Sequence, residues 1–499
     1  MSSYSSVQYF LEDYPRTLFP LATTQILIQN HADEILKYIY EKVLNKEKDY
    51  SFLPQLHCYA SKTGFHLRRT VKLDPVAELF IYDLVYKNRK TFRPDFCEDR
   101  KSFGYRFEDG KPIPQTKSYA AFKSSIAQAK KLYRFSAKFD IGSYFNSIYH
   151  HDLVSWFGEG GRSLKDAEYL GQFLREINAG RSVDCLPQGL HPCKVIGAEF
   201  LKFIDNSIRI RSQLMLRFMD DYYLFDNDES IMNSDFLKIQ RMLGEKNLFL
   251  NSAKTKIGQV DEINIGKNVD AIKAELLQVR RHIIEVSGID FEFEEEEEEE
   301  EYESLSDEKI DYLLHLLKDP DINEEDAELV LILLRDYGSD VLERMRSFLE
   351  RFPSLSKTVY TYCRYLDDKT ELSNLVKDFL KTSKNTTENQ LFWLAKITED
   401  YLMNSHNYAE IIYMLYAHSN ATSLTKAKIL EIPEHRFGLP ELRSEYLRTG
   451  QSDWLSWSAA VGCRKQDKIS RNYVLGYFSN ASPMNKLIFD CISKLDNTV

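Results

Sequence analysis

Four short blocks decide how this chain folds: FDIGSYFNSI (139–148), LPQG (186–189), LRFMDDYYLF (216–225) and LFLNSAKTKIG (248–258). The first block overlaps RFSAKFD, in which apolar and polar residues alternate, as on a strand with one buried face. In the third block, two apolar runs flank Asp220 and Asp221, which predicts a β-hairpin with both carboxylates at its tip. Asp140, at the end of the first strand, is expected to lie near them.

Carboxylates at the ends of rigid strands are the oxygen ligands that hard divalent cations need. Two such ions about 3.5–4 Å apart can clamp the attacking oxygen and the leaving phosphate of a nucleotidyl transfer. One Asp–Asp pair carries little information, because RYLDDKT (364–370) has one too. The order and conjunction of the four blocks therefore predict the site.

Composition sets the outer limits. A chain of 499 residues with 43% hydrophobic content predicts two to four domains with packed cores. The seven cysteines lack any CxxC spacing, which argues against a disulfide framework or zinc knuckle and for a reducing cytoplasm. No apolar run approaches the roughly 18 residues of a membrane span, and the N-terminus does not read as a secretory signal, so no membrane partner is expected.

The charge is unevenly distributed along the chain. Residues 1–260 hold 37 Lys+Arg and 31 Asp+Glu, a balance of +6, whereas the remainder holds 65−37 = 28 basic and 76−31 = 45 acidic residues, a balance of −17. The net charge of −11 therefore conceals a basic first half that suits a polyanionic partner.

The pattern along the chain predicts five segments and an α+β fold. Residues 1–60 are expected to be helical, and 61–260 mixed. An amphipathic helix is expected within 261–290. Residues 291–304 hold eight consecutive glutamates and are expected to form a solvated linker. Residues 305–499 have helical periodicity almost throughout, which predicts an irregular HEAT-like array of helical pairs.

The four blocks resemble palm motifs A, B, C and D of reverse transcriptases, in the family's order. The resemblance implies a right-hand polymerase fold, with fingers and palm at 61–260, a thumb-like helix at 261–290 and the all-α repeat region after the linker. It also implies two Mg²⁺ or Mn²⁺ ions. Asp140 and Asp220 would bind both ions, Asp221 would bind them less directly, and the Ile141 carbonyl would add a ligand. Lys254 matches the motif D lysine that protonates the leaving pyrophosphate, with a solvated surface lysine as the alternative.

The resemblance also assigns residues to the incoming nucleotide. Phe145 matches the steric gate that rejects a ribose 2′-hydroxyl, with an ordinary core phenylalanine as the alternative. Gln188 and Gly189 match the loop that lies against the nucleotide and base pair. The chain departs from the family at Phe218, where tyrosine is usual, and at Cys193, where serine is usual; the second departure puts the loop's contacts in doubt.

Cations from the fingers are needed for the triphosphate, and Arg106 and Lys123 are the leading candidates because they lie close upstream of motif A. Arg280 and Arg281 are candidates for gripping the nucleic-acid backbone. For Arg106 and Lys123, an ordinary basic surface side chain is the competing interpretation.

A palm followed by a helical half resembles bacterial abortive-infection (Abi) and related defence-associated reverse transcriptases. That resemblance implies a dNTP-using DNA polymerase of antiphage defence, forming homo-oligomers. Two modes stay open: protein-primed, untemplated synthesis with covalently attached DNA, or copying of a non-coding RNA. The priming tyrosine is unknown; the candidates are Tyr4, Tyr9, Tyr14, Tyr38, Tyr40 and Tyr302. The alternatives are a retron- or intron-like enzyme with a dedicated RNA and an inactive helical RNA-binding scaffold.

Overall fold

The computed structural model describes residues 4–47, 49–92, 97–159, 162–181, 186–260, 272–273, 275–277, 279 and 305–495. By their contacts the residues form two compact units. Unit 1 comprises Met1–Thr17, Leu36–Leu56 and Thr70–Val269; unit 2 comprises Leu18–Ile35, His57–Arg69 and Asp270–Val499. The glutamate run, Arg280 and Arg281 lie outside the described residues, and the expected domain boundaries stay a prediction.

Unit 1 is built on a five-stranded sheet with the order β3-β7-β8-β6-β9. Its strands are β3 (Arg100–Phe103), β6 (Phe135–Asp140), β7 (Leu214–Phe218), β8 (Asp221–Asp226) and β9 (Lys256–Gln259). β3 pairs with β7 in parallel, and the remaining pairs are antiparallel. The strand ending at Asp140 and the hairpin carrying Asp220 and Asp221 are thus confirmed.

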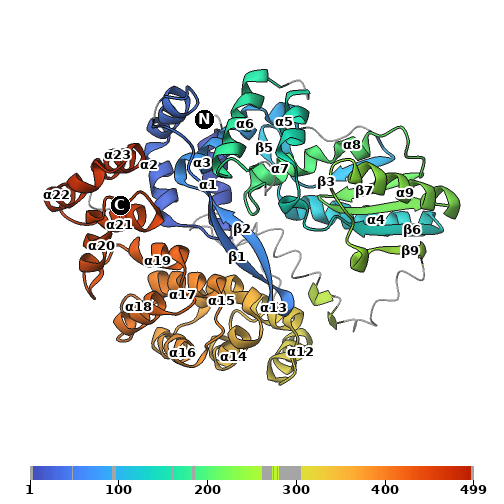
Figure 1. The fold of residues 1–499 in the computed structure, drawn as a ribbon. Helices are drawn as coiled ribbons and strands as arrows, with labels where there is room; N and C mark the ends of the chain where they lie inside the picture. The colour runs from blue at the N-terminus through green and yellow to red at the C-terminus, as the bar shows by residue number, and fades with distance from the viewer. Residues whose placement is uncertain are drawn as a thin grey trace. The chain divides into compact units, whose positions relative to one another are not determined.

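Helices pack on both faces of this sheet (Figure 1). On α4 (Gln115–Leu132), the ring of Phe122 lies 5.6 Å from that of Phe218 in β7. On α9 (Glu229–Gly244), the ring of Phe236 lies 5.3 Å from that of Phe139 in β6. Because side chains alternate along a strand, Asp140 points to the face opposite Phe139.

Helices α1 (Ser6–Asp13), α6 (Leu164–Ile177) and α7 (His191–Phe200) of unit 1 pack on α3 (Pro75–Lys87). Helix α3 is buried except at Lys87, and its first turn is capped by Asp74. Such burial explains why α3 is apolar on most of its surface, apart from Glu78 and Asp83. The other elements are α5 (His150–Glu159), α8 (Lys202–Asp205), β4 (Phe107–Glu108) and β5 (Lys111–Pro112).

Unit 2 is almost wholly helical. Helix α2 (Ala22–Tyr38) begins in unit 2 and ends in unit 1. The hairpin of β1 (Leu56–Lys62) and β2 (His66–Lys72) begins and ends in unit 1, and its middle, His57–Arg69, belongs to unit 2. The array itself comprises α12 (Asp307–Lys318), α13 (Glu324–Leu333), α14 (Gly338–Arg351), α15 (Ser356–Tyr362), α16 (Lys369–Thr382), α17 (Glu388–Tyr401), α18 (Tyr408–Ala417), α19 (Ser423–Leu430), α20 (Leu439–Arg448), α21 (Trp454–Gly462), α22 (Lys468–Ser479) and α23 (Pro483–Ile492).

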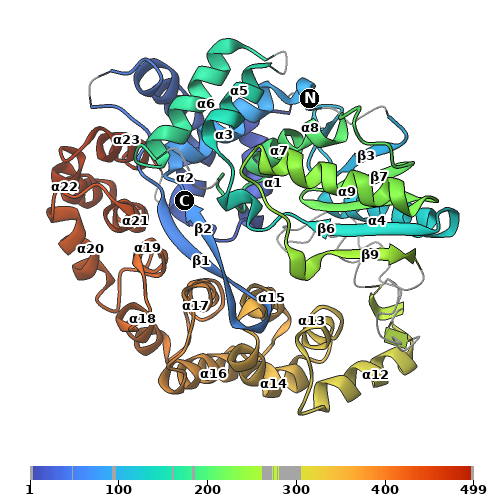
Figure 2. The same ribbon diagram turned by 45° about the vertical axis from the view of Figure 1, so that its right-hand side comes forward.

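These helices form two stacked rows, which Figure 2 shows following the chain order. α13, α15, α17, α19, α21 and α23 pack against one another in succession, while α14, α16 and α18, and α20 with α22, pack beside them. Each helix hides its apolar stripe on a neighbour, as the periodicity predicts. The helical C-terminal region is confirmed, whereas its HEAT-like character stays a prediction. Among the described residues, no helix is long and apolar enough to cross a membrane.

Candidate active site

The sheet brings the three predicted carboxylates together. Asp140, the last residue of β6, pairs in register with Asp221, the first of β8. Asp220 lies in the two-residue turn before it, and its carbonyl accepts a hydrogen bond from the Ile141 N–H at 3.3 Å. The turn places Met219 at a φ of 55°, a left-handed conformation that tight hairpins require and that costs a methionine about 1 kcal/mol or more.

The carboxylates repel one another. Burial, followed by the charge of Asp140, raises the pKa of Asp220 to about 6. The same two causes raise the pKa of Asp221. The Lys254 ammonium lies 2.9 Å from Asp140 Oδ2, and this hydrogen bond raises the lysine's own pKa. Lys254 is thus protonated at neutral pH, as a proton donor must be.

The fit of this cluster to divalent cations is chemical rather than geometric. Among the residues that the structure describes, no group of three or more Asp, Glu, His or Cys side chains is arranged to hold a metal ion as it stands. The donors are nevertheless hard oxygens whose mutual repulsion a cation would relieve, and the Lys254 ammonium already provides one positive charge there. To bind ions, the carboxylates must turn toward one another and Asp140 must exchange this partner.

A buried arginine supports the catalytic hairpin. Arg217 is completely buried and pairs with Asp205 of α8 through Nε, at 2.9 and 3.0 Å, and through Nη2. Its Nη1 donates to the Met219 carbonyl at 3.0 Å. The pair therefore fixes the turn that carries Asp220.

The LPQG loop is held at several points. The Leu186 N–H donates to the Phe145 carbonyl at 2.9 Å, and the Thr70 hydroxyl donates to the Gln188 carbonyl at 2.7 Å. Gly189 has a φ of 108°, which a residue with a Cβ rarely adopts. The first of these contacts places Leu186, at the start of the loop, beside Phe145, the predicted gate.

Phe145 is 8% exposed and lies against α7. A Cβ built on Gly197 would lie 3.4 Å from the rings of both Phe145 and Tyr144, and the Tyr144 hydroxyl donates to the Gly197 carbonyl at 2.7 Å. The glycine thus permits both rings to approach the helix closely. This packing suits a gate and equally a core residue, so the gate assignment stays a prediction.

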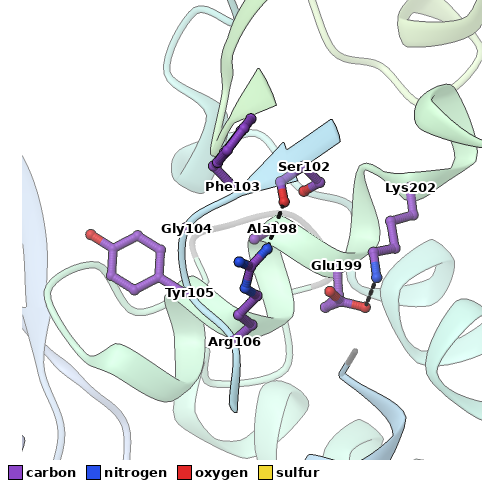
Figure 3. A pocket seen from close by; sticks show the side chains of 8 residues that line it. All are labelled: Ser102, Phe103, Gly104, Tyr105, Arg106, Ala198, Glu199 and Lys202. Atoms are coloured by element: carbon purple, nitrogen blue, oxygen red, sulfur yellow. Dashed lines mark hydrogen bonds and ion pairs between the residues drawn. The ribbon is translucent and has the colours of Figure 1, made fainter. Parts of the chain in front are cut away.

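The two predicted fingers cations lie in different places. Lys123, on α4, is exposed and close enough to Asp221 to lower its pKa. Arg106 is half-buried and donates through Nη1 to the Ser102 carbonyl at 3.1 Å. It lines a small pocket between β3 and α7 (Figure 3), shared with an ion pair of Glu199 and Lys202 at 2.8 Å. Lys123 therefore adjoins the carboxylates, while Arg106 lines this pocket.

Two neighbours of the site were missed by the sequence analysis. Lys138 lies two residues before Asp140 on the same face of β6, and its charge also lowers the pKa of Asp221. Strand alternation could have identified it. Thr70 had no such signal, because it lies 118 residues from Gln188 in sequence.

A tyrosine that primes synthesis must be accessible, and two of the candidates are not. Tyr9 and Tyr14 are completely buried in unit 1. Tyr302 lies outside the described residues. The priming residue therefore stays unknown.

Comparisons with known proteins bear on residues 90–299, which match the family model described as "Reverse transcriptase (RNA-dependent DNA polymerase)". No curated protein matches the chain. Telomerase structures are among the solved structures that are similar. Telomerase from Candida albicans in complex with a TWJ fragment of telomeric RNA has 14% identity and a TM-score of 0.27, over 78% of this chain and 70% of that chain.

Telomerase from Candida tropicalis, in its apo form, has 10% identity and a TM-score of 0.30, over 81% of this chain and 72% of that chain. Its complex with the TWJ fragment has 13% identity and a TM-score of 0.28, over 79% and 68%. Likeness at this level supports no inference about function. The family match does support one: residues 90–299 are a reverse-transcriptase domain, which indicates a nucleotidyltransferase polymerase.

Proposed function

We propose that the reverse-transcriptase domain makes this chain a DNA polymerase of bacterial antiphage defence, acting by two-metal-ion nucleotidyl transfer. In the reaction, a hydroxyl oxygen at the growing end attacks the α-phosphorus of a dNTP. The bond to the β-phosphate oxygen breaks, pyrophosphate leaves, and the hydroxyl loses its proton. When bound, two Mg²⁺ or Mn²⁺ ions would supply activation of the hydroxyl and stabilisation of charge on the phosphates.

The chain's own residues bind, orient and donate. Asp140, Asp220 and the Ile141 carbonyl supply oxygen ligands, with Asp221 beside them. Lys254 gives its proton to the leaving pyrophosphate, a contribution of roughly 10²–10⁴-fold. Lys123 offsets triphosphate charge, and Gln188 with Gly189 holds the base and sugar against Phe145.

One observation carries the catalytic part of this proposal. Within the domain, the half-buried carboxylate of Asp220 has a pKa raised to about 6, with the charge of Asp140 as the second cause after burial. Crowding of like charges costs stability and is typical of sites that bind a cation. An inactive scaffold would have no need to keep it.

The defence role and the partners rest on the resemblance and on the helical half that follows the domain. The proposed partners are dNTPs and a DNA product, in a homo-oligomer. Protein-primed synthesis without a template is the leading mode. Copying of a bound non-coding RNA is the competing one.

The test is synthesis by the purified full chain given each dNTP with Mg²⁺ or Mn²⁺. We expect deoxynucleotide polymer that Asp220→Asn eliminates and that Asp367→Asn leaves unchanged. Asp367 is a matched control because it begins the second Asp–Asp pair of the sequence and is exposed.

The state of the product separates the two modes. DNA that stays with the protein after denaturation and nuclease trimming, with a nucleotide adduct on a tyrosine, supports protein priming. Free DNA complementary to a co-purified RNA supports the competing mode. Absence of dNTP incorporation under all these conditions would overturn the polymerase proposal.

A further inference from the structure

Helix α7 begins without a capping side chain of its own. Leu190 is its N-cap and Pro192 occupies the second position. The N–H of the first residue, His191, instead donates to Asp13 Oδ2 at 2.9 Å. The same carboxylate oxygen accepts a hydrogen bond from the Tyr82 hydroxyl. An oxygen acceptor at the first turn stabilises a helix start, so Asp13, the last residue of α1, caps α7 from a distant part of the sequence.

A second contact from α1 reaches the same residue. The Tyr9 hydroxyl lies 2.5 Å from His191 Nδ1, and the two rings meet edge to face at 5.4 Å. Tyr9 is completely buried and His191 is 9% exposed. Burial raises the pKa of the phenol and lowers that of the imidazole to about 4, so both groups are neutral at pH 7. Two hydrogen bonds from one helix thus hold the residue that lies two positions after Gly189.

Because its first residue is held by these hydrogen bonds, α7 also restrains Phe145, the predicted sugar gate. Gly197, two turns further along, is in close contact with Phe145 and Tyr144. The loop before α7 is tied to the same place, because the Leu186 N–H donates to the Phe145 carbonyl. A shift of the α7 start would therefore move both the LPQG loop and the gate.

We propose that Asp13 is a positioning residue for nucleotide selection. Together with Tyr9, it fixes the position of the LPQG loop and of α7 relative to Phe145. This inference rests on the proposed polymerase function. It assigns a role to the N-terminal helix that the four motifs do not contain. Neither residue touches the nucleotide; both act through the His191 backbone and ring.

The activity test is Asp13→Ala, which removes the cap, beside Asp13→Asn, which retains the shape and one acceptor oxygen. We expect Asp13→Ala to raise KM for dNTP on the order of tenfold, a change matching a lost cap, and to raise the ratio of ribonucleotide to deoxynucleotide incorporation. Asp13→Asn should recover most of both losses, and Tyr9→Phe should raise the ratio less. Glu12→Gln is the control, because this exposed neighbour on α1 binds Tyr4 instead.

Hydrogen exchange gives a second reading that needs no catalysis. In Asp13→Ala the amide of His191 and the peptide 186–191 should exchange on the order of tenfold faster, while the α9 peptide keeps its rate. The proposal would be overturned if Asp13→Ala lowered kcat and thermal stability but left three quantities unchanged: KM for dNTP, the ratio of ribonucleotide to deoxynucleotide incorporation, and the exchange rate of peptide 186–191. If the wild-type chain proves inactive, the exchange result still decides whether Asp13 orders this loop.

Discussion

Each unit contains a cluster of charged side chains shielded from solvent. The two clusters differ in whether their charges are alike or oppositely paired. In unit 1, the acidic cluster of Asp140, Asp220 and Asp221 crowds like charges together. In unit 2, the paired cluster centres on Lys428, which is 1% exposed and bonded to Glu431 at 2.8 Å and to Glu399. Glu431 also accepts the N–H groups of Ala22 and Thr23 at 2.9 and 2.7 Å.

The difference separates a binding site from a structural network. In the paired cluster, charges are matched and hydrogen-bonded, which is how buried ions are tolerated. Among the residues that the structure describes, only the exposed Lys254 pairs directly with one of the three carboxylates of the acidic cluster. Its excess negative charge is a cost that a bound cation would offset. A carboxylate pKa raised by a like-charged neighbour is therefore a better marker of function than a buried charge that is paired.

The largest expected effect is that of Asp220→Asn. An amide is a neutral, poorer ligand of a dication, so synthesis should fall by about 10⁴-fold or more. Because the substitution also removes a repelled charge, the variant measured with chelator should unfold no earlier than wild type. Incorporation assays and thermal unfolding check both parts. A variant that loses activity only because it unfolds would remove the distinction between the two clusters.

The next effect is on stability and concerns the paired cluster. Lys428→Met leaves Glu431 and Glu399 without their cation in a buried place, which should cost about 3–5 kcal/mol. Lys486→Met is the control, since Lys486 forms an exposed pair with Asp490 and lies 4.9 Å from the centre of the Phe489 ring, and this substitution should cost about 1 kcal/mol or less. Urea unfolding monitored by circular dichroism measures both. Equal costs for the two variants would mean that the buried network is not structural.

A third prediction tests whether a perturbed pKa alone marks function. Burial, partly offset by Asp13, lowers the pKa of His191 to about 4, below the unfolded value of about 6.5. The unfolded chain therefore binds the extra proton first. Stability from this group is complete above about pH 6.5 and is lost as the pH falls toward 4, by about 2–3 kcal/mol.

His191→Phe should lose less stability than wild type over that range, because the ring no longer titrates. Unfolding midpoints at pH 7 and pH 4.5 give the comparison. Parallel pH profiles for the two proteins would contradict the assignment. The expected result identifies His191, whose pKa is shifted mainly by burial, as a group whose perturbed pKa reflects packing rather than ion binding.

The sequence predicted the parts of the fold that are written locally. Alternation in RFSAKFD and the apolar runs around Asp220 and Asp221 were sufficient for β6, β7 and β8, because a strand's period is visible within a few residues. The chemistry of the site followed from the order of the blocks. Helical periodicity likewise predicted the helices of unit 2.

Contacts between distant segments could not be predicted in this way. Asp13 lies 178 residues before His191, and no local pattern pairs them. The cross-over of α2 and the β1–β2 hairpin between the units is equally hidden, since their sequences show helix and strand but not the partner. Nor does spacing reveal that Lys254 pairs with Asp140, which depends on the side-chain conformation.

The smallest expected effect concerns Phe145 and asks whether the comparison of clusters extends to an apolar residue. If Phe145 is the gate, Phe145→Val should raise the ratio of ribonucleotide to deoxynucleotide incorporation by about tenfold, because the smaller side chain no longer excludes a 2′-hydroxyl. Phe157, completely buried in α5, is the matched control. Phe157→Val should lower the unfolding temperature and leave the ratio unchanged. Competition assays with paired nucleotides at fixed template or primer measure the ratio independently of total activity.

Since Phe145 packs on Gly197, its replacement also loosens α7, and a general loosening would raise KM for both sugars together. A ratio that stays constant while both KM values rise would make Phe145 a core residue like Phe157.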